Sequence, residues 1–319
     1  MTRMERTHPG TKVSDWASGI VNAPLPTTFQ ALHGYICGGY GVAPNTSYGY
    51  AGVSRIAFAD DSVSVMSNSL NNNVGPGYHN YNGNGQANAG TAGYYGGGTN
   101  YEIEKMPFTT EAWAVISASL SSDRYYAAGC ANSGSFGYWA GGWGAPVSTV
   151  DKQTFSNDSI SALSTGLSYA PGGANGMANV GTAGYYAGGY GFSTIDKLAF
   201  SNDARSTLSA TLSDNKYAGV AMTDSGTAGY VGGGGATAIS KIAFSNDART
   251  TLSATLASAS TLSAGMANSG SAGYGTGAGY GSPNMSVDKL TFSNDTVAQL
   301  SATITPYRNR LGAMANSSF

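Results

Sequence analysis

The stretch that decides the fold begins with Ala183-Gly-Tyr-Tyr-Ala-Gly-Gly189 and ends with Phe200-Ser-Asn-Asp203. The first segment reads as a strand, and the double glycine that ends it permits a positive φ. Residues 193–200 alternate in character from one residue to the next, which predicts a second strand. The final Ser-Asn-Asp predicts a turn, because Asn and Asp side chains cap their own backbone.

The same landmarks recur along the chain. The Gly-Tyr dipeptide begins at Gly34, Gly93, Gly137, Gly184, Gly229 and Gly273, with spacings of 59, 44, 47, 45 and 44 residues. The aromatic residue before the polar turn recurs as Phe58, Phe108, Phe155, Phe200, Phe244 and Phe292. A small apolar segment precedes each Gly-Tyr after the first and is expected to form a strand, as over residues 217–222. A Ser/Thr-rich segment follows the polar turns. Six repeats of four short strands are therefore expected, with no sustained helical periodicity.

A repeat of four strands in about 44 to 50 residues is typical of a propeller blade, whereas ankyrin, tetratricopeptide and leucine-rich repeats are shorter and carry helices. The last residues, 311–319, read as a first strand with no second strand behind it. The first repeat, in contrast, opens directly at its second strand, His33-Gly-Tyr-Ile-Cys-Gly-Gly39. We expect an all-β six-bladed β-propeller over residues 31–319, in which the C-terminal strand completes the first blade.

The scarce charges follow the repeat. The third strand carries a basic residue at equivalent positions, namely Arg55, Lys105, Lys152, Lys197, Lys241 and Lys289. Six residues later comes an acidic one, namely Asp61, Glu111, Asp158, Asp203, Asp247 and Asp295. A ring of cations for an anion, or of carboxylates for Ca²⁺, is one interpretation. We favour a structural ion pair, since a cation among packed blades needs a partner; the pair lies either within a blade or between neighbouring blades.

Composition excludes several classes of function. Charged residues are only 10% of the 319 residues and the net charge is −2, so the electrostatic footprint of a nucleic-acid binder is missing. No apolar run approaches the length of a membrane span, so membrane insertion is not expected. Cys37 and Cys130 read as buried small residues, and His8, His33 and His79 share no metal-ligand spacing. We therefore expect no metal site and no cofactor.

No catalytic residue is predicted. The run Gly232-Gly-Gly-Gly235 follows a strand and opens no helix, so it is not a phosphate loop. Glu102, Glu104 and Asp123 are candidate acids for a carbohydrate-active enzyme. Duplication of the repeat explains such carboxylates more simply, and we expect a protein that is not an enzyme.

The loops after the double glycines vary in length and are rich in aromatic residues. Because the repeats superpose, these loops are expected on one rim of the disc. Exposed Tyr and Trp among Ser, Asn and Gly suit sugar faces and protein surfaces alike. The candidate binding residues are Tyr40, Tyr48, Tyr81, Tyr101, Trp143, Tyr190 and Tyr280.

Double glycines, an aromatic residue ending the third strand and a basic residue opening some blades (Arg124, Lys216 and Arg308) resemble the kelch family. The fourth-strand Trp of kelch blades is present only as Trp113. This resemblance implies a kelch-like β-propeller of four-stranded blades and leaves open a cellular scaffold that binds a protein partner.

A closer resemblance is to repeats of virion and tail-fibre proteins of tailed bacteriophages of cyanobacteria and marine bacteria. It is carried by Asn132-Ser-Gly-Ser-Phe-Gly-Tyr-Trp-Ala-Gly-Gly142, Ser148-Thr-Val-Asp-Lys152, Phe155-Ser-Asn-Asp158 and Leu163-Ser164. The resemblance covers roughly residues 31–319. It implies a structural protein of the virion, at a tail or fibre, assembled in the host cytoplasm, and it brings no catalytic residue.

Residues 1–30 lie outside the repeats and read as an extended attachment segment with Trp16 and Phe29 as apolar contacts. On a phage particle this segment would bind other virion proteins. The rim loops would bind host cell-surface polysaccharide or another virion subunit. The sequence leaves the oligomeric state open.

Overall fold

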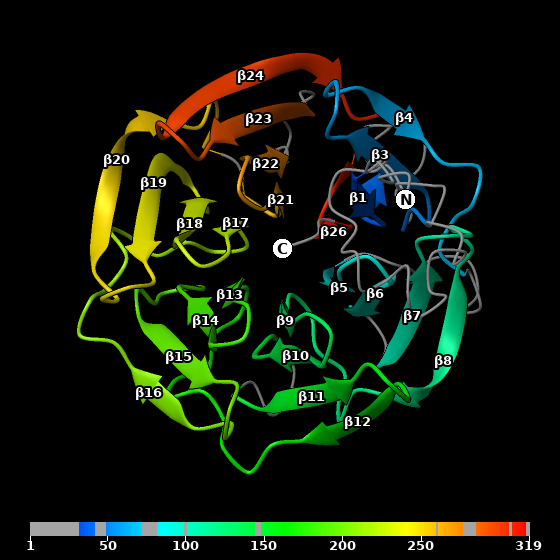
Figure 1. The fold of residues 1–319 in the computed structure, drawn as a ribbon, viewed down its shortest axis with the longest axis horizontal. Helices are drawn as coiled ribbons and strands as arrows, with labels where there is room; N and C mark the ends of the chain where they lie inside the picture. Colours follow the sequence, from blue (N-terminus) through cyan, green and yellow to red (C-terminus); the bar gives the residue numbers. More distant parts are fainter. Residues whose placement is uncertain are drawn as a thin grey trace, which may run out of the picture. The chain divides into compact units, whose positions relative to one another are not determined.

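The computed structural model describes residues 32–41, 49–71, 82–98, 101–143, 148–259, 261–276, 285–305 and 308–316. Their strands form six four-stranded antiparallel sheets and one two-stranded sheet. The six larger sheets are arranged as blades around a ring (Figure 1), so the predicted six-bladed β-propeller is confirmed. Within the described part of the chain, no helix is long and apolar enough to cross a membrane. The expected attachment segment, residues 1–30, lies outside the described residues.

The blades follow the order of the repeats, and in each blade the first strand lies nearest the centre of the ring and the fourth lies outermost (Figure 1). Blade 2 contains β5 (Gly83–Asn88), β6 (Ala92–Gly97), β7 (Glu102–Pro107) and β8 (Ala114–Ser119). Blade 3 contains β9 (Ala128–Asn132), β10 (Phe136–Ala140), β11 (Val150–Thr154) and β12 (Ser159–Ala162). Blade 4 contains β13 (Asn175–Asn179), β14 (Ala183–Ala187), β15 (Ile195–Ala199) and β16 (Arg205–Thr207). Blade 5 contains β17 (Val220–Asp224), β18 (Ala228–Gly233), β19 (Ala236–Ala243) and β20 (Arg249–Thr255). Blade 6 contains β21 (Ala264–Asn268), β22 (Ala272–Thr276), β23 (Ser286–Thr291) and β24 (Thr296–Thr303).

Blade 1 is shared between the two ends of the described chain. It contains β26 (Gly312–Ala315), β1 (His33–Cys37), β3 (Val53–Ala57) and β4 (Val63–Val65). Strand β26 pairs antiparallel with β1, with Tyr35 opposite Met314 and Ile36 opposite Ala313. A short sheet of β2 (Tyr40–Gly41) and β25 (Arg308–Asn309) joins the same two regions. The C-terminal strand therefore completes the first blade, as predicted.

Each Gly-Tyr dipeptide serves two blade interfaces, because consecutive residues of a strand point to opposite faces. A Cβ at Gly184 would lie 2.6 Å from Sγ of Cys130 in the preceding blade. The ring of Tyr185 points the other way and stacks on Phe244 of the next blade, with 4.9 Å between centroids. The residues that cover the equivalent glycines are Met266, Met314, Gln86, Cys130, Met177 and Met222. The buried thiol of Cys130 thus fills the position that methionine fills in four blades.

The repeated charges pair between neighbouring blades, which answers the question that the sequence left open. In blade 3 the Lys152 Nζ lies 2.7 Å from Oδ2 of Asp203 in blade 4, and the Tyr138 hydroxyl donates to Oδ1 of the same carboxylate at 2.9 Å. The other ion pairs are Arg55–Glu111, Lys105–Asp158, Lys197–Asp247, Lys241–Asp295 and Lys289–Asp61. The other tyrosine donors, in the same order, are Tyr35, Tyr94, Tyr185, Tyr230 and Tyr274.

Backbone geometry places each of these carboxylates. All six acidic residues have a left-handed backbone, with φ between 52° and 60°. Aspartate tolerates this conformation better than most residues, which explains its place as the last residue of a four-residue turn. In blade 4 the Asp203 N–H donates to the Ala199 carbonyl at 2.9 Å. The side chain is thereby presented to the preceding blade. Burial first, and then the bond to Asp203, raise the pKa of Tyr138, so its hydroxyl remains a donor.

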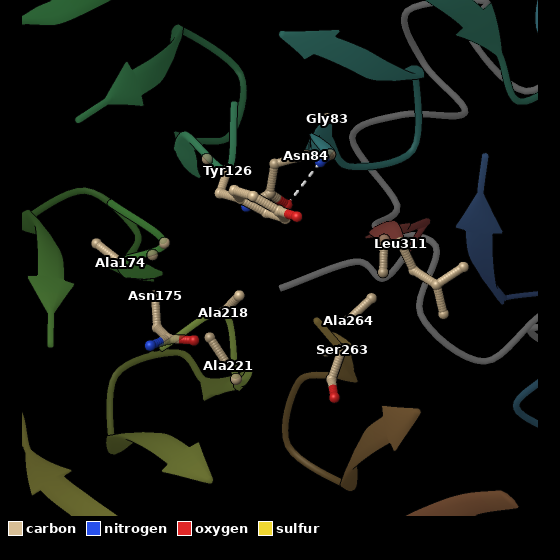
Figure 2. Close-up of a pocket in the computed structure, with 17 residues that line it drawn as sticks. Gly83, Asn84, Tyr126, Ala174, Asn175, Ala218, Ala221, Ser263, Ala264 and Leu311 are labelled. Atoms are coloured by element: carbon tan, nitrogen blue, oxygen red, sulfur yellow. Dashed lines mark hydrogen bonds between the residues drawn. The ribbon is translucent and has the colours of Figure 1, made fainter. Parts of the chain in front are cut away.

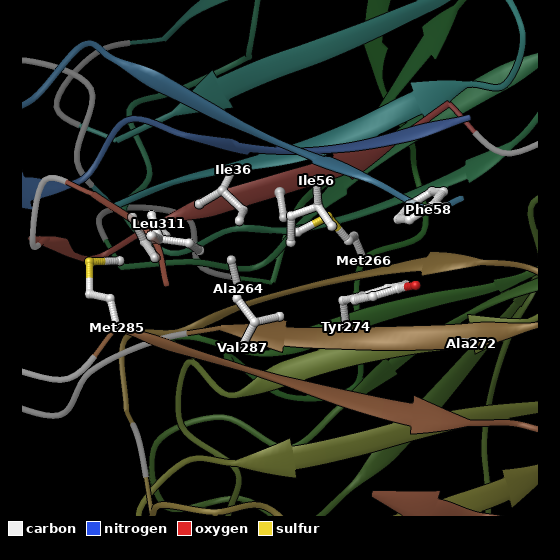
Figure 3. Packing of buried hydrophobic residues seen from close by; sticks show 12 residues of the cluster. Ile36, Ile56, Phe58, Ala264, Met266, Ala272, Tyr274, Met285, Val287 and Leu311 are labelled. Atoms are coloured by element: carbon white, nitrogen blue, oxygen red, sulfur yellow. The ribbon is translucent and has the colours of Figure 1, made fainter. Parts of the chain in front are cut away.

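The same contact joins blade 6 to blade 1 and closes the ring. Tyr274 and Lys289 both donate to Asp61, each at 2.7 Å at its closest. The ring of Tyr274 stacks on Phe58 at 5.1 Å. Figure 3 shows Phe58 and Ile56 of blade 1 facing Tyr274 and Val287 of blade 6 across a buried apolar cluster. The last interface in the ring is therefore built like the internal ones.

We predict that Gly184→Ala lowers the free energy of unfolding by about 1–3 kcal/mol, because the added Cβ overpacks the contact with Cys130. In the double variant with Cys130→Ala the sulfur is absent, so the combined loss is expected to be smaller than the sum of the two single losses. Urea unfolding followed by fluorescence measures all three values. Strictly additive losses would contradict this packing.

Candidate functional site

The ring has two faces with different chemistry. In an antiparallel blade, the loop between the second and third strands leaves the sheet at the same end as the linker to the next blade. We call the surface formed by these loops and linkers the loop face, and the opposite surface the turn face. The turn face holds the polar turns that carry the ion-paired carboxylates, so the loop face is the one that carries the variable aromatic loops.

The turn face is tied together by hydrogen bonds between adjacent blades. Side-chain oxygens at the end of five of the first strands accept from a glycine N–H in the turn of the next blade. For example, Asn179 Oδ1 accepts from Gly226 N at 3.0 Å. The other such bonds are Asn316 with Gly90, Asn88 with Gly134, Asn132 with Gly181 and Asp224 with Gly270. The repeated polar groups of this face are thus used by the scaffold.

On the loop face the linkers form a ring around the mouth of the central channel. One residue in each linker has a positive φ, and the six are Asn82, Tyr126, Gly173, Ala218, Leu262 and Arg310. Backbone bonds connect neighbouring linkers, as where Tyr126 N donates to the Asn82 carbonyl at 2.6 Å and Ala218 N donates to the Gly173 carbonyl at 2.8 Å. The strained conformations are therefore stabilised by this ring of bonds.

The channel mouth is small and polar. Figure 2 shows Asn84, Tyr126, Asn175 and Ser263 among the residues around it. Its cavity volume is about 70 Å³, which is room for a few water molecules. A larger ligand would have to lie across the mouth and over the loop face.

Four aromatic rings lie in contact on the loop face of blades 3, 4 and 5. Centroid distances are 5.8 Å from Trp143 to Tyr190, 5.6 Å from Tyr190 to Tyr217 and 5.7 Å from Tyr217 to Tyr126. Tyr126 also lines the channel mouth. Trp143 is 41% exposed and Tyr190 is 61% exposed. We call these four residues the aromatic surface.

Backbone contacts hold the aromatic surface in place. Trp143 and Tyr125 exchange two backbone hydrogen bonds of 2.7 and 2.9 Å, and Tyr190 N donates to the Gly172 carbonyl at 2.8 Å. A side chain at Gly172 would overlap the Trp143 ring, and one at Gly173 would overlap the Tyr217 ring. Two glycines thus form the floor on which the rings lie. Rings fixed in this way lose little freedom when a ligand binds.

The structure brings only some of the predicted rim residues into contact with one another. Trp143 and Tyr190 are in contact, as expected for one rim. Tyr101 is 53% exposed in blade 2, and Tyr40 in blade 1 packs with the guanidinium of Arg310, 5.1 Å from its ring centroid. Neither is one of the four rings. The remaining candidates, Tyr48, Tyr81 and Tyr280, lie outside the described residues.

Sequence reasoning missed Tyr217 and Tyr126. Residue Tyr217 was expected to begin a first strand over residues 217–222, but β17 begins at Val220 and Tyr217 lies in the linker. The sequence did contain a signal for their position in the linkers, because both tyrosines closely follow a basic residue that opens a blade.

Those basic residues are buried anchors. Arg124 donates to the Trp139 and Thr149 carbonyls and pairs with Asp151 at 2.8 Å. Arg308 donates to the carbonyls of Ile36 and Gly52 in the same manner. In blade 5, Lys216 donates to the Ala238 carbonyl. Each cation ties a linker to the strand ends of its own blade.

The carboxylate of Glu104 belongs to a repeated contact. It is 6% exposed and accepts a hydrogen bond from the backbone N–H of Asn71 in the linker from blade 1. Asp151, Asp196 and Asp288 occupy the same position in blades 3, 4 and 6, and accept from the N–H groups of Ser121, Ser168 and Ala257. Burial is the main cause that raises the pKa of Glu104 to about 7.

No protein-family model matches the chain, and no curated protein matches it. Among the described residues, no three His, Cys, Asp or Glu side chains gather as a metal-binding group. The aromatic surface is thus the strongest candidate for a binding site in the part of the chain that the structure describes.

We predict that Glu104→Gln removes a pH dependence of stability. Because the folded pKa of about 7 lies above the ordinary value of 4.5, Glu104 favours the folded state below pH 4.5, and this contribution is lost as pH rises to 7. Glutamine keeps an acceptor and does not titrate. Relative to the parent protein, the free energy of unfolding of the variant should rise by up to about 3 kcal/mol between pH 4.5 and 8. Denaturant unfolding of variant and parent at both pH values measures this gain. If the two proteins differ by the same free energy of unfolding at pH 4.5 and pH 8, the raised pKa of Glu104 is contradicted.

Proposed function

We propose that this protein is a non-enzymatic adhesion protein whose aromatic surface binds glycan. The observation that carries the proposal is the contact of four aromatic rings across three blades, two of them at least 41% exposed. Contiguous exposed apolar surface of this kind is typical of a binding site. Rings of Tyr and Trp offer flat apolar area for sugar C–H faces, together with polar groups at their edges.

The biological setting of the proposal comes from the repeats. Their resemblance to repeats of tailed-phage virion proteins supports a place on a virion, at a tail or fibre. Residues 1–30 would then bind other virion proteins, and the loop face would contact host cell-surface polysaccharide. Contact with another virion subunit is the competing use of the same surface.

A carbohydrate-active enzyme is favoured by one observation, the pKa of about 7 of Glu104, which suits a general acid. The burial of Glu104 and its place in the repeated linker contact support a structural role instead. The two functions differ in what happens to the polymer. Incubation with a polysaccharide that the protein binds should leave the chain length unchanged.

We predict that the purified protein binds host envelope polysaccharide and that Tyr190→Ala weakens the affinity about tenfold, the effect of losing a central aromatic contact. The matched control is Tyr101→Ala, which removes a similarly exposed tyrosine outside the aromatic surface. Calorimetry and chain-length analysis of the same samples test binding and cleavage together. Equal affinity of both variants and the parent would refute the binding site. If the protein shortens the polymer and Glu104→Gln abolishes this cleavage, the enzymatic function is favoured instead.

A further inference from the structure

The Lys and Arg side chains of the described residues lie away from the aromatic surface or are buried, which restricts what this surface can bind. Of the 15 Lys and Arg residues, Arg3, Arg6 and Lys12 lie in residues 1–30, so the propeller has 12. All 12 fall within the described residues. Each of them can therefore be located.

Six of the 12 are the basic partners of the ion pairs between blades. Three more, Arg124, Lys216 and Arg308, are at most 2% exposed and anchor the linkers. Arg205 and Arg249 lie on the outermost strands β16 and β20. Arg310 packs on Tyr40 in blade 1. None of the 12 is an exposed cation beside the rings of blades 3, 4 and 5.

Two carboxylates lie in the linkers that lead to these rings. The linker that leads to Tyr126 contains the exposed Asp123, and the linker that leads to Tyr217 contains Asp214, which is 34% exposed and pairs with Lys216. A polyanionic chain on this surface would find no exposed cation among the described residues and would meet these two carboxylates. Like charges brought together in this way disfavour binding.

Resting on the glycan-binding function proposed above, we propose that the ligand is a neutral glycan of several sugar units. Its chain lies along Trp143, Tyr190 and Tyr217 and ends over Tyr126 at the channel mouth. The contiguous rings explain the need for several units, since one sugar covers only part of the run. Stacking and hydrogen bonds to backbone groups then supply the affinity, without ion pairing.

Binding is tested with the full chain and purified polymers of matched length: dextran, mannan and galactan as neutral probes, polygalacturonate and heparin as anionic ones. We expect binding to at least one neutral polymer, with an affinity that changes less than about twofold between 0.05 and 0.5 M NaCl, because screening acts on charges. Affinity should rise with oligosaccharide length up to about four units, the number of rings.

One variant and a matched control assign the site. Trp143→Ala should weaken binding about tenfold, whereas the control Tyr101→Ala should stay within about twofold. Urea unfolding of each variant confirms that the fold is intact. Salt-sensitive binding of an anionic polymer that depends on Trp143 overturns the neutral ligand and leaves the glycan-binding function standing. Binding to none of the five polymers overturns the neutral ligand; if host envelope polysaccharide also fails to bind, the proposed function falls with it.

Discussion

The structure depends on one carboxylate that reaches from each blade to the blade before it. That carboxylate accepts a tyrosine hydroxyl and a basic group at once, as Asp203 does from Tyr138 and Lys152. The paired side chains are 18–34% exposed, so each ion pair alone adds modest stability. Its main effect is geometric, because it fixes the tyrosine on the stacked phenylalanine and so sets the orientation of neighbouring blades.

The candidate site is a consequence of that regular packing. Because the turn face uses its polar atoms to join blades, variation is left to the loop face, where linkers meet around the channel. Blades 3, 4 and 5 place Trp143, Tyr190 and Tyr217 in contact there because their loops are held by backbone bonds and by glycines beneath the rings. The same scaffold places nine of its 12 cations in its interfaces and anchors, so that no exposed cation of the described residues lies beside the aromatic surface.

Much of the scaffold could be predicted from sequence, since each repeat carries its turn signals and its strand alternation. The closure by residues 311–316 followed from a strand missing at one end and present at the other. The direction of pairing by Lys152 could not be predicted, because it depends on how blades pack. Tyr217 was missed because the strand starts three residues later than its apolar pattern suggests. The sequence could not show that Glu104 is buried, and its burial is what distinguishes it from a surface carboxylate.

The most direct test of the closed ring compares coupling energies at two interfaces. Double-mutant cycles of Lys152→Met with Asp203→Asn, and of Lys289→Met with Asp61→Asn, are measured by urea unfolding. The second pair joins residues that are 228 apart in sequence. A closed ring predicts a stabilising coupling of about 0.5–1 kcal/mol in both cycles. Coupling in the first cycle and none in the second would show that the ring is open between blades 6 and 1.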